Sequence, residues 1–356
     1  MPADLRCPAC GNTYPDRWRC ECGEPLEFAE RPLPDGPPPE VPDARHGLWA
    51  FEPFLPVDPL VTLGEGWTPL VDAPGWDCGF KLDYTFPTGS FKDRGAATML
   101  SRAAELGVDR VIEDSSGNAG AAVATYAARA GIDARIYVPA SVKASKLRAI
   151  ERTGAAVERV EGEREAVTEA CVAAVEAGEG WYASHAWNPA FFAGTATMAY
   201  EIAAQRDWSV PDAVVLPLGH GTMFLGAYRG FTALRDVGWT ERVPRLLGAQ
   251  AAGYAPIAEA LHGPSDEEND LADGIQIREP VRMAEIREAI QATDGDAIAV
   301  GRETTERELD HLHAAGFYTE PTCGVAPAAL REYRDRGDLG PDADVVVALS
   351  GSGLKT

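Results

Sequence analysis

A lysine among small hydroxyl-bearing residues is the strongest candidate for chemistry in this sequence. Lys92 lies in the run P-T-G-S-F-K-D-R-G at residues 87–95, directly before an alanine-rich stretch. The N–H groups at a helix start, together with desolvation, lower the pKa of an amine, so Lys92 can act as a nucleophile that forms a Schiff base. A lysine taken at random is more often a solvated surface residue, so this interpretation needs support from elsewhere in the chain.

Three loops of small residues provide further candidate sites. The run D-S-S-G-N-A-G at 114–120 offers hydroxyl groups and helix-start N–H groups that suit a carboxylate, although a serine N-cap explains the same pattern. The run P-L-G-H-G-T at 217–222 has two glycines that let the backbone wrap a phosphate, which is a weak signal alone. The run S-G-S-G-L-K at 350–355 also fits a simple strand exit.

The elements that must position these loops alternate between strand and helix from about residue 60 onward. Alternation of this kind predicts an α/β fold with a parallel sheet, helices on both faces and the ligand at the carboxyl ends of the strands. Apolar runs predict strands at 110–113, 134–138, 213–216, 246–249 and 345–349, and alanine-rich segments predict helices at 95–106, 118–131, 143–153 and 164–177.

Four cysteines near the start predict a metal site. Cys7-x-x-Cys10 and Cys20-x-Cys22 are each followed by glycine, a pattern typical of a structural zinc held by four thiolates. Two disulfides or four idle thiols are the alternatives, and disulfides are disfavoured in a cytosolic chain. Residues 31–45 are rich in proline and aspartate, which predicts a stiff linker.

Charge limits the classes of partner. The chain has 356 residues, with 32 Lys and Arg against 55 Asp and Glu, giving a formal net charge of −23. Such a charge argues against nucleic acid and anionic membranes as partners, because phosphates are repelled. Abundant acidic residues with few lysines suggest a halophilic, high-salt cytosol. The first residues have no apolar signal-peptide core, and no apolar run reaches the ~18 residues of a membrane span, so a cytoplasmic protein is expected.

In this order, the lysine run and the three loops resemble the fold-type-II pyridoxal-phosphate (PLP) enzymes. Within that group they are most similar to threonine synthase, whose G-E-G-x-T-P-L segment resembles residues 64–70. The resemblance implies two three-layer α/β/α domains with mostly parallel sheets, preceded by a small zinc ribbon. The implied boundaries are 1–30 for the ribbon, 31–58 for the linker, 59–96 and 190–356 for a large PLP-binding domain, and 97–189 for a small α/β domain. A homodimer is expected, as in many fold-type-II enzymes.

The resemblance also implies a role for each matching residue. Lys92 matches the lysine that carries PLP and shuttles protons, and Ser350 matches the hydroxyl residue opposite the pyridine nitrogen, which favours elimination and replacement over transamination. Asn118 matches the asparagine that binds the cofactor's 3′-oxygen. The E-P segment at 320–321 resembles one that lies near the ring. The family's loop that binds the cofactor phosphate is matched by Gly219, His220, Gly221 and Thr222. Its turn that binds the substrate carboxylate is matched by Ser115, Ser116 and Gly117.

One departure from the family pattern concerns the substrate. Threonine synthases commonly carry N-P-Y-R-x-E-G, whose arginine binds the phosphate of O-phosphohomoserine, but Phe191 stands at that position here. Either the missing positive charge is supplied by Lys143, Lys146 or Arg148, or the substrate has no such phosphate. Three hypotheses follow: a threonine synthase; another PLP lyase or replacement enzyme, such as a threonine/serine dehydratase or a cysteate-synthase-like enzyme; and a non-catalytic PLP-binding paralogue.

Overall fold

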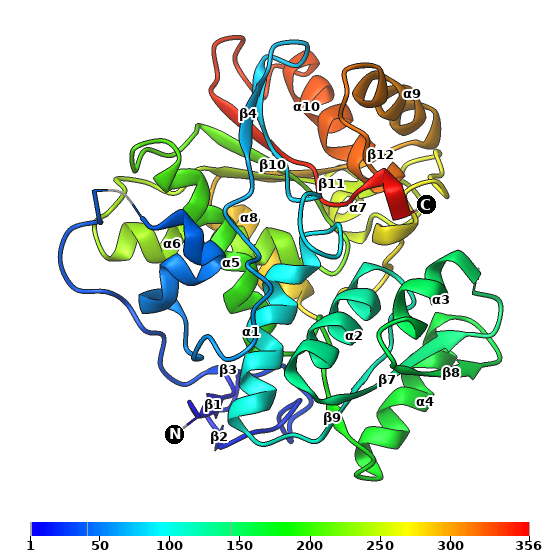
Figure 1. Ribbon diagram of the computed structural model, residues 1–356. Helices are drawn as coiled ribbons and strands as arrows, with labels where there is room; N and C mark the ends of the chain where they lie inside the picture. The colour runs from blue at the N-terminus through cyan, green and yellow to red at the C-terminus, as the bar shows by residue number, and fades with distance from the viewer. Residues whose placement is uncertain (1, 41, 143, 356) are drawn as a thin grey trace.

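The computed structural model describes residues 2–40, 42–142 and 144–355, which are arranged around three sheets (Figure 1). A three-stranded sheet of order β2-β1-β3 lies at the N-terminal end, and sheets of six strands (β12-β11-β10-β13-β5-β4) and four strands (β8-β7-β6-β9) form the body. Helices cover the faces of both larger sheets. The predicted α/β class with mostly parallel sheets is confirmed.

The six-stranded sheet is parallel except at one edge, where β4 pairs antiparallel with β5. Its strands are β4 (Leu70–Ala73), β5 (Cys78–Lys81), β10 (Ala213–Pro217), β11 (Arg245–Ala251), β12 (Asp296–Val300) and β13 (Val345–Ala348). The two central strands, β10 and β13, are apolar throughout because helices bury both of their faces.

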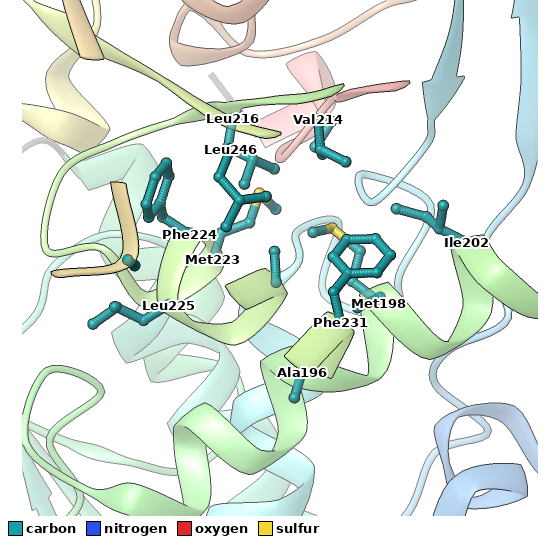
Figure 2. Packing of buried hydrophobic residues seen from close by; sticks show 14 of the residues in the cluster. Ala196, Met198, Ile202, Val214, Leu216, Met223, Phe224, Leu225, Phe231 and Leu246 are labelled. Atoms are coloured by element: carbon teal, nitrogen blue, oxygen red, sulfur yellow. The ribbon is translucent and has the colours of Figure 1, made fainter. Parts of the chain in front are cut away.

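Side chains of β10 alternate between two cores, as the two-residue period of a strand requires. Val214 and Leu216 pack with α5 (Pro189–Ala204), α6 (Thr222–Asp236) and α8 (Met283–Ala292), as Figure 2 shows for α5 and α6. On the opposite face, Val215 packs with α10 (Val325–Asp335), which lies against α9 (Arg302–Ala314). The short helix α7 (Pro256–His262) contacts β12 at the sheet edge.

The four-stranded sheet is wholly parallel and holds β6 (Arg110–Glu113), β7 (Asp133–Pro139), β8 (Ala156–Val160) and β9 (Trp181–Tyr182). One face packs against α2 (Asn118–Ala130) and α3 (Ala144–Glu151), and the other against α4 (Arg164–Glu176). Helix α1 (Lys92–Glu105) contacts both α5 and α2, so its first residue lies where the two layered regions meet. The predicted domain boundaries stay a prediction.

The N-terminal sheet consists of β1 (Leu5–Arg6), β2 (Thr13–Tyr14) and β3 (Glu27–Phe28) and lies against both larger regions. Arg282 donates to the backbone oxygens of Leu26 and Trp187, at 3.0 Å each. The Trp18 ring packs edge-on against Tyr182 and Trp187, with centroids 5.3 and 5.1 Å apart. These contacts fix the N-terminal residues on the body.

The segment predicted as a linker is packed in its second half. Its described residues before position 44 form no helix or strand, but a kinked 3-10 segment, η1 (Ala44–Phe54), buries Leu48, Phe51 and Phe54. Three further single 3-10 turns are η2 (Asp273–Ile275), η3 (Pro321–Gly324) and η4 (Gly353–Lys355). None of the helices described has the length and apolar character needed to span a bilayer.

Candidate active site

The Lys92 amine lies against the glycine-containing loop that follows β10. Lys92 begins α1, and its Nζ donates a hydrogen bond of 3.1 Å to Oγ1 of Thr222, the first residue of α6. Burial lowers the Lys92 pKa to about 8, against the opposing effects of Glu113 and Glu320. A much larger fraction of this amine is therefore neutral near pH 7 than for an ordinary lysine, as a nucleophile requires.

The loop between β10 and α6 favours glycine at two positions. Gly221 has a φ of +80°, and a Cβ there would lie 2.6 Å from Cδ1 of Ile286. A Cβ on Gly219 would lie 3.1 Å from Cα of Ile275. The bare backbone therefore turns tightly into the N-terminus of α6, where N–H groups and the helix dipole favour a phosphate.

His220 of this loop and Ser90, two residues before Lys92, each carry a polar atom without a partner among the described residues. In the parts of the chain that the structure describes, Nδ1 of His220 and Oγ of Ser90 are buried without a hydrogen-bond partner. Buried polar atoms are nearly always satisfied in folded proteins, so such atoms indicate a place for a polar ligand. The residues present thus fit a phosphate-bearing cofactor with an aldehyde within reach of Lys92.

Asn118 and Glu320 meet beside the site. Nδ2 of Asn118, the first residue of α2, donates to both carboxylate oxygens of Glu320 at 3.1 and 2.9 Å. Its Oδ1 accepts a 2.7 Å hydrogen bond from Nζ of Lys355. A Cβ on Gly351 would come within 2.2 Å of the Glu320 carboxyl carbon, so this carboxylate packs on the third small-residue loop. Three separate sequence runs therefore converge here.

Ser350 is joined to the lysine run through the backbone. Its carbonyl oxygen accepts a 3.0 Å hydrogen bond from the N–H of Phe91, the residue before Lys92. Its hydroxyl lies 3.6 Å from Sγ of Cys323, and burial raises the pKa of that thiol to about 12. Ser350 thus faces a neutral thiol, and no carboxylate is hydrogen-bonded to it among the described residues.

The loop at 115–117 does not use serine to cap α2. Gly117 is the N-cap residue and makes no side-chain capping bond, whereas Ser115 Oγ accepts from Gly117 N at 3.3 Å within the loop. A Cβ on Gly120 would lie 1.8 Å from the Ser115 carbonyl oxygen, so the loop folds closely over the helix start. The N-cap alternative is wrong, and Ser115, Ser116 and Gly117 stay predictions as carboxylate ligands.

Phe191 is a core residue. It lies in the first turn of α5, after the N-cap Asn188, and is fully buried. Its ring packs on Gly95 of α1, where an added Cβ would lie 2.3 Å from Phe191 Cδ1. Of the cations named as replacements for the missing arginine, Lys143 lies outside the described residues, the Lys146 side chain is not described, and Arg148 is exposed on α3.

Three ionisable residues close to the predicted His220 were missed by sequence reasoning: Glu113, Arg164 and His185. His185 Nδ1 lies 2.8 Å from Glu113 Oε1, the His185 and His220 ring centroids are 5.4 Å apart, and Arg164 Nη2 lies 3.3 Å from His220 Nε2. Burial lowers the pKa of His220 to about 3. One signal was available: Glu113 is a charged residue at the carboxyl end of an apolar strand, where ligands bind in parallel sheets.

The four N-terminal cysteines form one cluster. Their Sγ atoms all lie within 4.8 Å of one another, with Cys7 to Cys22 at 3.6 Å and Cys10 to Cys20 at 3.4 Å. All four are free thiols, which contradicts the disulfide alternative. Thiolates at 2.3 Å from a tetrahedral zinc would be about 3.8 Å apart, so the donor set fits that metal.

Comparison with known proteins agrees with this geometry. Residues 61–351 match the protein family described as pyridoxal-phosphate dependent enzyme. The chain is 34% identical to the threonine synthase of Methanosarcina acetivorans, over 86% of this chain and 80% of that one. It is 32% identical to the threonine synthase of Methanocaldococcus jannaschii, over 98% of this chain and 92% of that one.

The chain belongs to the threonine synthase family of pyridoxal-phosphate-dependent enzymes. Solved structures of similar fold include threonine deaminase isoform 2 from Solanum lycopersicum, with a TM-score of 0.69, 20% identity and coverage of 92% of this chain and 88% of that one. A PLP-dependent aspartate racemase has a TM-score of 0.69 at 24% identity, covering 80% of this chain and 90% of that one. At these identities the structures support the fold that the family shares.

Proposed function

We propose that this enzyme converts O-phosphohomoserine and water into threonine and phosphate, as a step of amino-acid biosynthesis. The observation that carries the proposal is the Lys92 amine held against Thr222 at the start of α6, in a chain that belongs to the threonine synthase family. A reactive amine beside a phosphate-type loop is the arrangement that PLP chemistry requires.

The residues around Lys92 would hold the cofactor at three points. The loop 219–222 and the start of α6 would bind its phosphate, Asn118 would donate to its 3′-oxygen, and the Ser350 hydroxyl would face its ring nitrogen. When bound, PLP supplies an electron sink for a carbanion at the substrate's α-carbon. A neutral hydroxyl at Ser350 keeps that sink moderate, which suits elimination.

The chain's own groups would bind the substrate and move its protons. The uncapped N-terminus of α2, with Ser115 and Ser116, would bind the α-carboxylate through N–H and hydroxyl groups. Lys92 Nζ, with its pKa lowered to about 8, can take up the α-proton and return a proton later in the cycle at neutral pH. A carboxylate held at the start of α2 would orient the substrate so that its Cα–H bond faces that amine.

A dehydratase acting on threonine or serine is the second candidate. The buried Phe191 ring, which takes the position of the phosphate-binding arginine of the family pattern, favours it. Incubation of the holoenzyme with O-phosphohomoserine, O-phosphoserine, threonine and serine, while phosphate and keto acid are followed, separates the two. Phosphate and threonine from O-phosphohomoserine support the synthase; keto acid from threonine or serine without phosphate release supports the dehydratase. No turnover of any of the four favours the non-catalytic paralogue.

The proposal includes a structural zinc on Cys7, Cys10, Cys20 and Cys22. Four thiolates leave no open position on the metal, so the zinc would stabilise the small N-terminal sheet rather than catalyse. Metal analysis should find about one zinc per chain, and Cys7→Ser should remove it and lower the melting temperature. Cys78→Ser, at a half-buried thiol outside the cluster, is the matched control. Metal-free protein with unchanged stability contradicts this assignment.

The setting of the enzyme is also part of the proposal. We place it in the cytoplasm of a high-salt cell as a homodimer, acting on a small amino acid and not on nucleic acid or membranes. The excess of 55 acidic over 32 basic residues supports the high-salt setting, because screening by salt relieves their mutual repulsion. Activity and stability that rise from 0.1 M to molar salt support it, and sedimentation measures the oligomeric state.

A further inference from the structure

The family pattern places a phosphate-binding arginine where this chain has Phe191, and the structure leaves no room for a cation there. The Phe191 side chain is fully buried, packs on Gly95 and has its ring centroid 5.7 Å from Lys92 Nζ. A dianionic phosphate needs charged donors within hydrogen-bond distance. If the proposed substrate is right, its phosphate must be bound by a cation from another element.

The side chain of Arg164 reaches the site from another element. Arg164 is the first residue of α4, which covers the far face of the four-stranded sheet, yet its Nη2 lies 3.3 Å from Nε2 of His220 on the other sheet's loop. Its charge also contributes to lowering the pKa of Lys92, His185 and His220. The guanidinium therefore lies near both the Lys92 amine and His220, although Arg164 is an exposed residue.

His185 can add a second donor, its Nε2, beside Arg164. His185 Nδ1 lies 2.8 Å from Oε1 of Glu113, and burial raises the pKa of Glu113 and lowers that of His185. When the Glu113 carboxyl donates to Nδ1, the neutral imidazole carries its hydrogen on Nε2. When Nδ1 donates to the carboxylate instead, Nε2 of the neutral ring is an acceptor, so a phosphate oxygen beside Nε2 would favour the first arrangement.

We propose that Arg164, together with the His185–Glu113 pair, binds the distal phosphate of the substrate and replaces the arginine that the family carries at position 191. This inference rests on the proposed function, because it assigns a site for the phosphate of O-phosphohomoserine. Arg164 lies on the small four-stranded layer and contacts His220 on the large one, so a phosphate bound beside this contact would also tie the two layers together.

The test uses the PLP-loaded full-length enzyme and two ligands that differ only in the phosphate. The visible absorbance of the bound cofactor reports the dissociation constants of O-phosphohomoserine and homoserine. Arg164→Gln should weaken O-phosphohomoserine about 10- to 100-fold, the effect of losing a charge-assisted contact, and leave homoserine nearly unchanged. Arg164→Lys should recover part of the loss. Arg148→Gln, at an exposed arginine of α3, is the matched control.

Each outcome decides the assignment. Equal weakening of both ligands by Arg164→Gln assigns Arg164 a structural role and overturns the proposal, as does no weakening of either. An effect of Arg148→Gln in place of Arg164→Gln moves the site to α3 and also overturns it. Wild-type enzyme that releases no phosphate from O-phosphohomoserine contradicts the proposed function itself, whereas phosphate release with an unchanged KM in Arg164→Gln contradicts only this inference.

Discussion

The two sides of the Lys92 amine are built in different ways. The cofactor side, which comprises the loop 219–222, Asn118 and Ser350, is made of backbone turns and small residues at strand ends. The distal side, which comprises Glu113, His185 and Arg164, is made of ionisable side chains from β6, from the turn between β9 and α5, and from α4. His220 lies at the boundary between them.

This difference explains why the cofactor-binding runs can be shared by a whole family while the residues that bind the rest of the substrate can change from one member to another. A phosphate held by glycine backbone requires particular residues at adjacent positions, so a short run carries the whole arrangement. A phosphate held by side chains only needs cations that arrive at the same place, and they can come from any nearby element. In the proposal above, Phe191 replaces the family's arginine and Arg164 supplies a cation from another element.

The largest expected effect comes from removing the Lys92 amine of the cofactor side. Lys92→Ala should lower turnover by about 10²- to 10⁴-fold or more, because it removes both the covalent attachment and the proton-transfer amine. The protein should also lose the visible absorbance of lysine-linked PLP. Lys355→Met, at the lysine that contacts Asn118, should keep that absorbance. A covalently attached cofactor in Lys92→Ala contradicts the assignment.

A smaller effect tests the backbone of the phosphate loop. Gly221→Ala should weaken PLP binding about tenfold, because a φ of +80° strains alanine and its Cβ meets Ile286 at 2.6 Å. Gly238→Ala is the matched control, with a φ of +73° and no atom within 4 Å of an added Cβ. Titration of apoenzyme with PLP measures both. Equal affinity in the two variants would show that the loop does not contact the cofactor.

A change at Phe191 tests whether this residue belongs to the core or to the distal side of the site. Phe191→Leu should destabilise the fold by about 1–1.5 kcal/mol, because the ring packs on Gly95, and should leave substrate affinity nearly unchanged. Denaturant unfolding and a ligand titration measure the two quantities separately. A large loss of substrate affinity with unchanged stability would place Phe191 in the binding site instead of the core.

The smallest expected effect is a shift in the pH dependence of PLP uptake, which involves Lys92 and Arg164 of the distal side. Attack on PLP requires the unprotonated amine, so the rate at which apoenzyme takes up PLP should rise with pH and reach half its maximum near pH 8, the lowered pKa of Lys92. An ordinary lysine would give a midpoint near 10.4. Arg164→Gln removes a positive charge that lowers this pKa, so the midpoint should move upward. A midpoint unaffected by Arg164 would place its guanidinium far from the amine.

Local pattern predicted much of the fold and of the cofactor side. The strand expected at 110–113 forms with those bounds, and the helix expected at 118–131 ends one residue early. Both have strong apolar or alanine-rich periodicity and end in glycine or small-residue loops. The strands β8 and β9 were not predicted, because β8 exposes much of its surface at a sheet edge and β9 has two residues.

The Lys92 run, the glycine loops and the cysteine pairs could be recognised without a structure, because in each case the chemistry depends on residues that are neighbours along the chain. The meeting of Glu113, His185, Arg164 and His220 is visible only in the folded chain, since they are distant in sequence and come from the regions of both larger sheets. The folded chain also shows that Phe191 faces the core. The direction of a helical side chain depends on which neighbours its helix packs against, and no local pattern encodes that.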